Sequence, residues 1–416
     1  MLISDVLYQP VSMITHDDLQ RINIFYATEI DLHLYLYVYR NGVPIAEKVK
    51  VAFQSGGKCT YIMLPKAEED FVAEWKLFDM NGKNVSSVVS EWKKPREWNF
   101  YVMLSSHTDI GLHNSQYIQR YNSEKLLERA MEHCDLTENE REENKYRYVM
   151  EGTWFWNNYA ADHGEKAASE IVDKYIRTGK IGLCAGIAGN HTQTFGLEEM
   201  CRSTYGRRRQ KEMWELDLKT FAMVDNNGLT WSMVQPYADA GYEYVFFAPN
   251  QWNPLPSTVW ECNTELEGFM FNPEAGGGGS RIDVRYRSEH PMVFWWWDEH
   301  HKKKLLVWCS TMYRRGGKNF GMSIDMQPSY NTLITMENAC SKQLPLMDCK
   351  FPYDVWMFAC YADDQEPDMG VTGSIKMWNE KWKFPKMQTL GNPDEPFKIL
   401  KERFGDKIPE ISGDIT

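Results

Sequence analysis

The run Phe100-Tyr101-Val102-Met103-Leu104, followed by Ser105-Ser106-His107-Thr108-Asp109-Ile110-Gly111, decides the fold prediction for this chain. An unbroken apolar run of this length indicates a strand that is buried on both faces, as in a parallel sheet. Residues i and i+2 of an extended chain project to the same side, so His107 and Asp109 can bind one cation together. Catalytic groups of α/β barrels lie at the C-terminal ends of their strands, and this segment therefore predicts a metal site at such an end. The spacing of His107 and Asp109 by itself also fits two residues that cap a helix or form a hydrogen bond with each other.

The chain after this segment alternates between apolar runs and helical stretches. Such alternation predicts a parallel sheet covered by helices, either an α/β barrel or a doubly wound sheet. Residues 249–310 break the pattern and predict a long loop with a hairpin around Asp298-Glu299. The apolar runs are 100–104, 146–150, 181–184, 244–247 and 355–359, and the clearest helices are 123–133, 166–178, 197–220 and 236–240.

The first 95 residues have a different pattern, in which apolar and polar residues alternate in short segments. Residues 30–39 alternate and run into Arg40-Asn41-Gly42, which predicts a half-buried strand and a hairpin turn. Similar strands are expected at 48–53 and 71–78, and together they indicate a small all-β sandwich. We therefore predict two domains, 1–95 and 96–416, and expect a chain that starts near Arg96 to fold without the first.

Composition narrows the partners and the compartment. A formal net charge of −12 would repel a polyanion, which argues against nucleic acid. Nine Cys without a CxxC pair favour a reducing compartment, and we expect a cytoplasmic protein. No stretch approaches the roughly 18 apolar residues that span a bilayer, so no membrane partner is expected. Whether the protein forms a homo-oligomer stays open.

Several segments, taken in chain order, resemble the N-terminal catalytic barrel of glycoside hydrolase family 38, the retaining α-mannosidases. Ser105 to Gly111 is similar to the family's HSHxDxGW segment, whose His and Asp are zinc ligands. The resemblance covers about residues 98–414 and is most specific at His107 and Asp109. The other similar segments are 148–156, 178–183, 221–242, 294–308 and 361–365.

The resemblance implies a seven-stranded (β/α) barrel, a zinc cofactor and a carbohydrate substrate. It assigns His107 and Asp109 to the metal, and Asp364 of the pair Asp363-Asp364 to the acid/base role. In this family one Asp both binds zinc and attacks the anomeric carbon. Trp154 and Trp156 are candidates for a platform under the sugar, although core packing is the default for an indole.

The sequence departs from the family pattern after the third barrel strand. His191 lies where the resemblance places the nucleophilic Asp, with Asn190 beside it as a substrate-binding candidate. An imidazole can bind zinc but cannot form a glycosyl ester, so His191 is predicted to be a third ligand. Either another carboxylate, Asp225 or Glu151, is then the nucleophile, or a metal-bound water attacks and inverts the sugar. Glu151 is also a candidate substrate contact.

The end of the sequence is a second departure, because residues 407–414 resemble the close of the barrel domain. The helical bundle that supplies a further zinc His in the family is expected to be missing. Two alternatives to a glycosidase therefore stay open. One is a metal-dependent carbohydrate deacetylase, and the other is a degenerate, non-catalytic barrel that binds a glycan or a partner.

Overall fold

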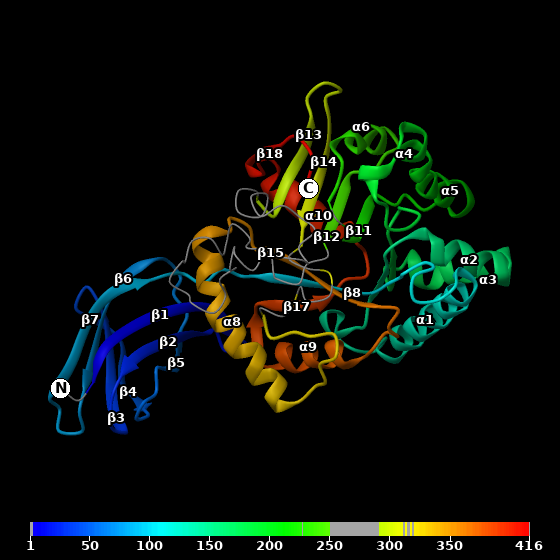
Figure 1. Ribbon diagram of the computed structural model, residues 1–416. Coiled ribbons are helices and arrows are strands. Elements are labelled where there is room, and N and C mark those ends of the chain that lie inside the picture. Colours follow the sequence, from blue (N-terminus) through cyan, green and yellow to red (C-terminus); the bar gives the residue numbers. More distant parts are fainter. Residues whose placement is uncertain are drawn as a thin grey trace.

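The computed structural model describes residues 3–226, 228–249, 291–310, 313, 317 and 320–415. Figure 1 shows an antiparallel β-module, drawn in blue at the N-terminal end, beside a larger α/β part that contains the C-terminus. None of the helices in these ranges combines the length and the apolar composition that crossing a bilayer requires. The loop predicted at 249–310 lies largely outside the described residues, but the hairpin around Asp298-Glu299 is present.

Seven strands form the β-module, as two antiparallel sheets that share one apolar core. One sheet has the order β1-β2-β5 and the other β4-β3-β6-β7. Alternation decides which side chains enter the core: in β3, Leu34, Leu36 and Val38 are buried while the residues between them face outward. The strands are β1 (Ser4–Thr15), β2 (Leu19–Ala27), β3 (Leu32–Arg40), β4 (Val43–Phe53), β5 (Cys59–Pro65), β6 (Phe71–Phe78) and β7 (Asn84–Trp92).

The predicted turn between β3 and β4 is confirmed. Asn41 and Gly42 both have positive φ, 50° and 76°, as a two-residue type I′ hairpin loop requires. The antiparallel module that the alternating pattern predicted is thus present in the first 92 residues.

The module and the α/β part are joined by more than the chain segment between Trp92 and Asn99. Ile14 at the end of β1 pairs with Phe384 of β16 (Trp382–Phe384). Val11 and Met13, both fully buried, belong to the apolar core of the α/β part. Ser12 Oγ donates to Asp348 Oδ2 at 2.6 Å, on helix α8 (Tyr330–Lys350). The last third of β1 is therefore shared between the two parts.

Parallel strands make up the centre of the α/β part. β8 (Asn99–His107) lies between β15 (Val355–Asp363) and β17 (Lys386–Thr389), and β9 (Tyr148–Met150) pairs with β10 (Ile181–Leu183). A third group runs β11 (Thr220–Asn226), β12 (Tyr244–Pro249) and β14 (Lys303–Cys309), with β13 (Val293–Asp298) antiparallel to β14 and β18 (Glu410–Ile411) at the edge. The predicted α/β architecture is confirmed, while the count of seven strands in one closed ring stays a prediction.

Helices follow the strands as the alternation predicted. The stretch predicted as one helix at 197–220 is two helices, and the second ends at Trp214, where Glu215 has a left-handed backbone with a φ of 54°. The helices are α1 (Gln116–Leu136), α2 (Thr153–His163), α3 (Glu165–Ile171), α4 (Leu197–Ser203), α5 (Tyr205–Trp214), α6 (Val234–Asp239), α8, α9 (Gly370–Lys381) and α10 (Glu395–Phe404).

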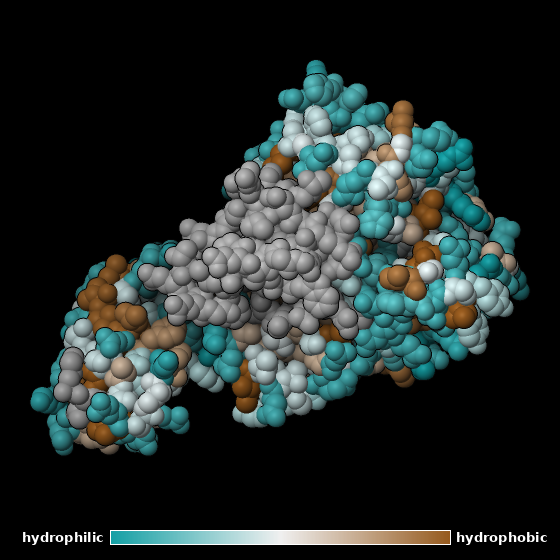
Figure 2. All heavy atoms as spheres, viewed as in Figure 1, coloured by the Kyte–Doolittle hydropathy of each residue, from teal (hydrophilic) through white to brown (hydrophobic). Residues whose placement is uncertain are grey.

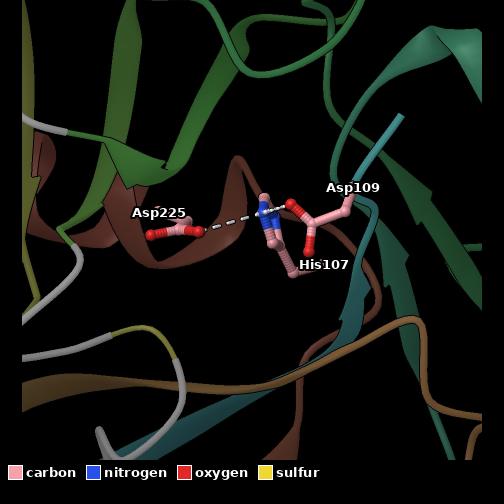
Figure 3. Close-up of side chains that lie close together, drawn as sticks. All are labelled: His107, Asp109 and Asp225. Atoms are coloured by element: carbon pink, nitrogen blue, oxygen red, sulfur yellow. Dashed lines mark ion pairs between the residues drawn. The ribbon is translucent and has the colours of Figure 1, made fainter. Parts of the chain in front are cut away.

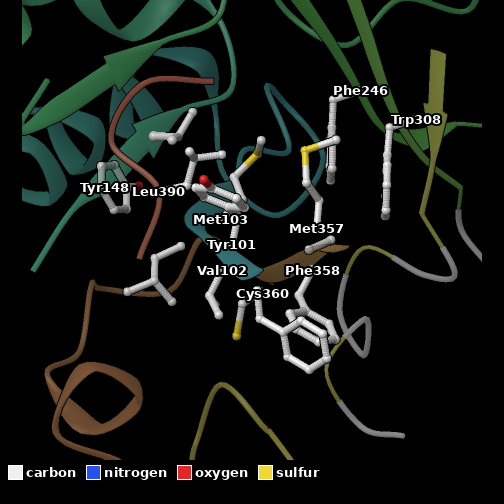
Figure 4. Packing of buried hydrophobic residues seen from close by; sticks show 14 of the residues in the cluster. Tyr101, Val102, Met103, Tyr148, Phe246, Trp308, Met357, Phe358, Cys360 and Leu390 are labelled. Carbon is white, nitrogen blue, oxygen red and sulfur yellow. The ribbon is translucent and has the colours of Figure 1, made fainter. Parts of the chain in front are cut away.

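Buried side chains on both faces of β8 and β15 fix these two strands at the centre of the core. Figure 4 shows Met357 on the side of Phe246, whereas Val102 and Phe358 point the opposite way. All four are almost completely buried, in agreement with the apolar runs of the sequence. Since the two strands are parallel and in register up to the pair His107 and Asp363, their C-terminal residues reach the same edge of the sheet.

Candidate metal centre

His107, the last residue of β8, has its imidazole held from behind by a carboxylate. Its Nδ1 lies 3.1 Å from Oε2 of Glu151, and the other oxygen, Oε1, accepts a hydrogen bond of 2.9 Å from the Thr108 amide. Both side chains are buried, with 9% of His107 and 6% of Glu151 exposed. Glu151 follows β9, so the packing of neighbouring strands brings the two residues together. The ring is therefore oriented, with Nε2 on the side away from Glu151.

Two carboxylates face that Nε2 (Figure 3). Asp109 Oδ1 lies 3.7 Å from it and Asp225 Oδ2 lies 3.5 Å from it. One ligand atom from each of the three residues falls within 4.8 Å of the others, and we call His107, Asp109 and Asp225 the first group. Asp225 lies in β11 with a φ of 55°, a left-handed conformation that is uncommon for a non-glycine residue. Such backbone strain is often found at functional sites.

The first group concentrates negative charge around His107. Burial opposes a charged imidazole, yet the carboxylates of Glu151 and Asp225 raise the pKa of His107 well above its ordinary value. Burial also raises the pKa of Asp109, although His107 and His113 act against this. Several carboxylates thus share a small, partly buried volume, which is an arrangement that a divalent cation stabilises.

A second group adjoins the first and shares Asp109 with it. His113 Nδ1 lies 3.1 Å from Asp109 Oδ2 and 3.2 Å from Asp364 Oδ2, and Asp109, His113 and Asp364 form this second group. Asp364 directly follows β15, has a φ of 51°, and its amide donates to the His107 carbonyl. Gln119 Nε2 on α1 donates to Asp364 Oδ1 at 2.6 Å. The second group therefore lies at the same edge of the sheet.

The donor set of the first group fits a divalent cation such as zinc. Imidazole nitrogen and carboxylate oxygens are common zinc ligands, and three protein ligands are typical of catalytic zinc sites. Metal-binding histidines usually donate their other ring N–H to a carboxylate or carbonyl, as His107 does toward Glu151. The contact between Nδ1 and Glu151 thus leaves Nε2 of His107 as the atom that can bind a cation.

The geometry does not bring His191 to the first or the second group, and its role as a third ligand stays a prediction. His191 is exposed at the start of a short 3₁₀ turn and belongs to neither group. Asp225 lies beside His107 instead. A carboxylate on β11 thus lies close to His107.

The other predicted residues lie at different depths. Trp156 is fully buried and packs against Tyr159 and Trp214, so its indole fills the core, and its role as a sugar platform stays a prediction. Trp154 and Asn190 are half-buried, and their substrate role stays a prediction. Asp363, which is aligned with His107 in the ladder, accepts a hydrogen bond of 2.9 Å from the Tyr313 hydroxyl.

Sequence reasoning missed His113 and Gln119. His113 stands four residues after Asp109, in the turn before α1, and Gln119 is a fully buried amide in the second turn of that helix. A histidine close behind a His-x-Asp segment was the available signal for the first. Nothing in the sequence distinguishes the second from other helix glutamines.

Comparisons with known proteins support the α/β fold of this chain. No family model and no curated protein matches this chain. An α-mannosidase from Enterococcus faecalis V583 is similar in structure, with a TM-score of 0.54 and 14% identity over 77% of this chain. The match covers 31% of that enzyme, so this chain spans about a third of its length.

Two further matches have lower TM-scores. A 4-α-glucanotransferase from Thermococcus litoralis gives 0.44 at 13% identity, covering 76% of this chain and 42% of that one. A polysaccharide deacetylase from Bacillus cereus gives 0.23 at 10% identity, covering 61% and 89%. The α/β part of this chain therefore has a fold similar to that of an α-mannosidase.

Proposed function

We propose that this protein is a metal-dependent glycoside hydrolase of the α-mannosidase type, on a closed seven-stranded (β/α) barrel. The observation that carries the proposal is the convergence of His107, Asp109 and Asp225 from two strand ends onto one point. Its support from outside the chain is the fold likeness to an α-mannosidase. The substrate class that follows is carbohydrate, and the cation is zinc.

His107, Asp109 and Asp225 would hold the cation, and Glu151 would fix the ring of His107. When bound, zinc would supply a Lewis acid that holds sugar hydroxyls and orients the ring for cleavage. The absence of a lysine or arginine among the ion pairs of Asp109 in the described part of the chain leaves that carboxylate for the metal.

Asp225 is the residue that we assign as nucleophile. Glu151, the other candidate, has both oxygens engaged on the buried side of His107 and is 6% exposed. Asp225 is more exposed, at 16%, and directs Oδ2 toward His107, so its second oxygen is the one assigned to attack. That oxygen bonds to the anomeric carbon as the bond from this carbon to the leaving-group oxygen breaks.

Asp364 is the residue that we assign as acid and base. Gln119 fixes Oδ1, which leaves Oδ2 on the side of Asp109 and His113. In the first step the leaving-group oxygen takes the proton of Asp364. In the second step water bonds to the anomeric carbon, gives its proton back to Asp364, and the ester to Asp225 breaks. Two displacements at one carbon give a product with retained configuration.

Leaving-group dependence in an Asp364→Ala variant tests this assignment. A 2,4-dinitrophenyl glycoside needs no proton at its leaving group, whereas an alkyl or unsubstituted phenyl glycoside does. We expect the zinc-loaded variant to lose about 10²- to 10⁴-fold in the glycosylation step on the poor leaving group and far less on the activated one. Asp368→Asn, on the same segment but bonded to Gln327 and Gly370, is the matched control.

The same assays separate the alternatives. Equal losses on both leaving groups would remove Asp364 from the acid role. NMR of the first-formed sugar reports retention or inversion, and inversion would contradict Asp225 as nucleophile. Release of acetate from acetylated oligosaccharides without cleavage of any glycoside would identify a deacetylase. Glycan binding without any turnover would identify a non-catalytic barrel.

A further inference from the structure

The two oxygens of Asp109 point to different partners. Oδ1 lies 3.7 Å from His107 Nε2 in the first group, and Oδ2 lies 3.1 Å from His113 Nδ1 in the second. A carboxylate that offers one oxygen to each of two sites is the usual bridge in two-metal centres, where the ions lie about 3.5–4 Å apart. The first group accounts for only one of these oxygens.

Asp364 has the complementary arrangement. Gln119 Nε2 holds its Oδ1 at 2.6 Å, so the remaining oxygen, Oδ2, is the atom directed to His113. Within the described ranges, the ion pairs of Asp109 and Asp364 are formed with histidines and with no lysine or arginine. One cation in the first group would therefore leave the charge of Asp364 without a permanent positive partner.

Gln119 provides an independent observation at the same place. Its side chain is fully buried, its amide lies against Asp364, and its Oε1 has no hydrogen-bond partner among the described residues. Buried amide oxygens are nearly always paired, with protein, water or an ion. The residue that fixes Asp364 thus carries a buried polar atom that the described residues leave without a partner.

We propose that Asp109, His113 and Asp364 form a second divalent-cation site, bridged to the first through Asp109. One imidazole and two carboxylates suit zinc and similar ions. His113 is 52% exposed, in contrast to the 9% of His107. The second site is therefore open to solvent, and we expect it to bind more weakly than the first.

Occupation of this site has a consequence that rests on the proposed function. A cation on Asp364 Oδ2 takes the oxygen that would carry the catalytic proton. The second ion is therefore inhibitory: hydrolysis rises as the first site fills and falls again at higher zinc concentration. The fall should be about 10-fold or more, because a general acid is typically worth at least that much.

Zinc binding to the full chain tests the proposal. Equilibrium dialysis against ZnCl₂ with elemental analysis should give two ions per wild-type chain, and one ion in the His113→Ala variant. The rate of that variant should change little between low and high zinc. His163→Ala is the matched control, because His163 is also partly exposed and paired with a carboxylate, Glu124, on another helix. It should still bind two ions.

The outcomes are distinguishable. A single ion in the wild type that His107→Ala removes would overturn the second site and leave the proposed function intact. Two ions in both the wild type and the His113→Ala variant would also overturn it. Binding of no ion at all would refute the second site and the metal-dependent function together. Circular dichroism of each variant checks that a lost ion does not reflect a lost fold.

Discussion

Replacing Glu151 by Gln isolates the effect of one negative charge behind His107. The amide has the same shape, so its oxygen can still accept the hydrogen bond from the Thr108 amide, which now goes to Oε1 at 2.9 Å. The change removes the carboxylate that lies 3.1 Å from His107 Nδ1. His107 then loses the partner that makes its Nε2 a stronger ligand.

The expected magnitude follows from the role of such partners in metal sites. Removing a carboxylate behind a metal-binding histidine typically costs 10- to 100-fold in metal affinity. This corresponds to about 1.4–2.8 kcal/mol, since each factor of ten is worth about 1.4 kcal/mol. The loss should lie near the upper end, because Glu151 is 6% exposed and little solvent screens its charge.

Competition with a chromogenic zinc chelator at pH 7 measures this loss directly. The matched control is Glu337→Gln, a buried carboxylate that pairs with Lys381 and accepts from Trp382 Nε1. The control should destabilise the protein without changing its zinc affinity. Zinc affinity in Glu151→Gln equal to that of the wild type would refute the reasoning that Glu151 orients a metal ligand.

Three further outcomes are expected. Deleting residues 1–95 should lower the free energy of unfolding of the α/β part by about 3–6 kcal/mol, since the burial of Val11 and of Met13 contributes about 1.5–3 kcal/mol each. An unchanged melting temperature would contradict this. Partial burial acts to raise the pKa of Glu243, but hydrogen bonds from two lysines lower it from 4.5 to about 2. The ionised Glu243 therefore stabilises the folded protein fully above pH 4.5, and this stabilisation is lost as the pH falls toward 2. Chemical denaturation should show the Glu243→Gln variant about 1 kcal/mol less stable than the wild type at pH 7 and equal to it near pH 2. Asp225→Asn should lose both zinc and turnover, and retention of zinc at the wild-type affinity would place the third ligand elsewhere.

The sequence predicted the features that depend on residues close together along the chain. Alternation in residues 30–39 predicted an outward and an inward face, and the Asn41-Gly42 turn followed from backbone chemistry. His107 and Asp109 were predicted as a pair because both lie at the end of one apolar strand. These are local patterns, and the structure contains each of them.

Asp225 was predicted as a candidate nucleophile, but its place as the third member of the first group could not be obtained in this way. Asp225 comes from β11, and its approach to His107 depends on the order of strands and on a left-handed backbone at that residue. The resemblance to family 38 placed His191 at the metal because this residue follows the third strand at the expected distance along the chain. Distance along the chain does not reveal which loops meet at the edge of a sheet.

The domain boundary illustrates the same limit. The change of pattern near Arg96 predicted separate cores, and an independently folding fragment was expected. The structure assigns the last third of β1 to both parts, so we now expect the fragment to be destabilised. Apolar residues such as Val11 and Met13 indicate burial, but they do not indicate the core to which they contribute.

The pairing of β1 with β16 also sets an order of events during synthesis. β1 leaves the ribosome well before its partner, which begins only at Trp382. At roughly 5–20 residues per second, the interval between the two is about 20–80 s. β1 can form its local hairpin with β2 early, but the side chains of Val11 and Met13 must wait for the rest of the chain. During that interval a nascent chain presents an apolar strand end that a holding chaperone would recognise.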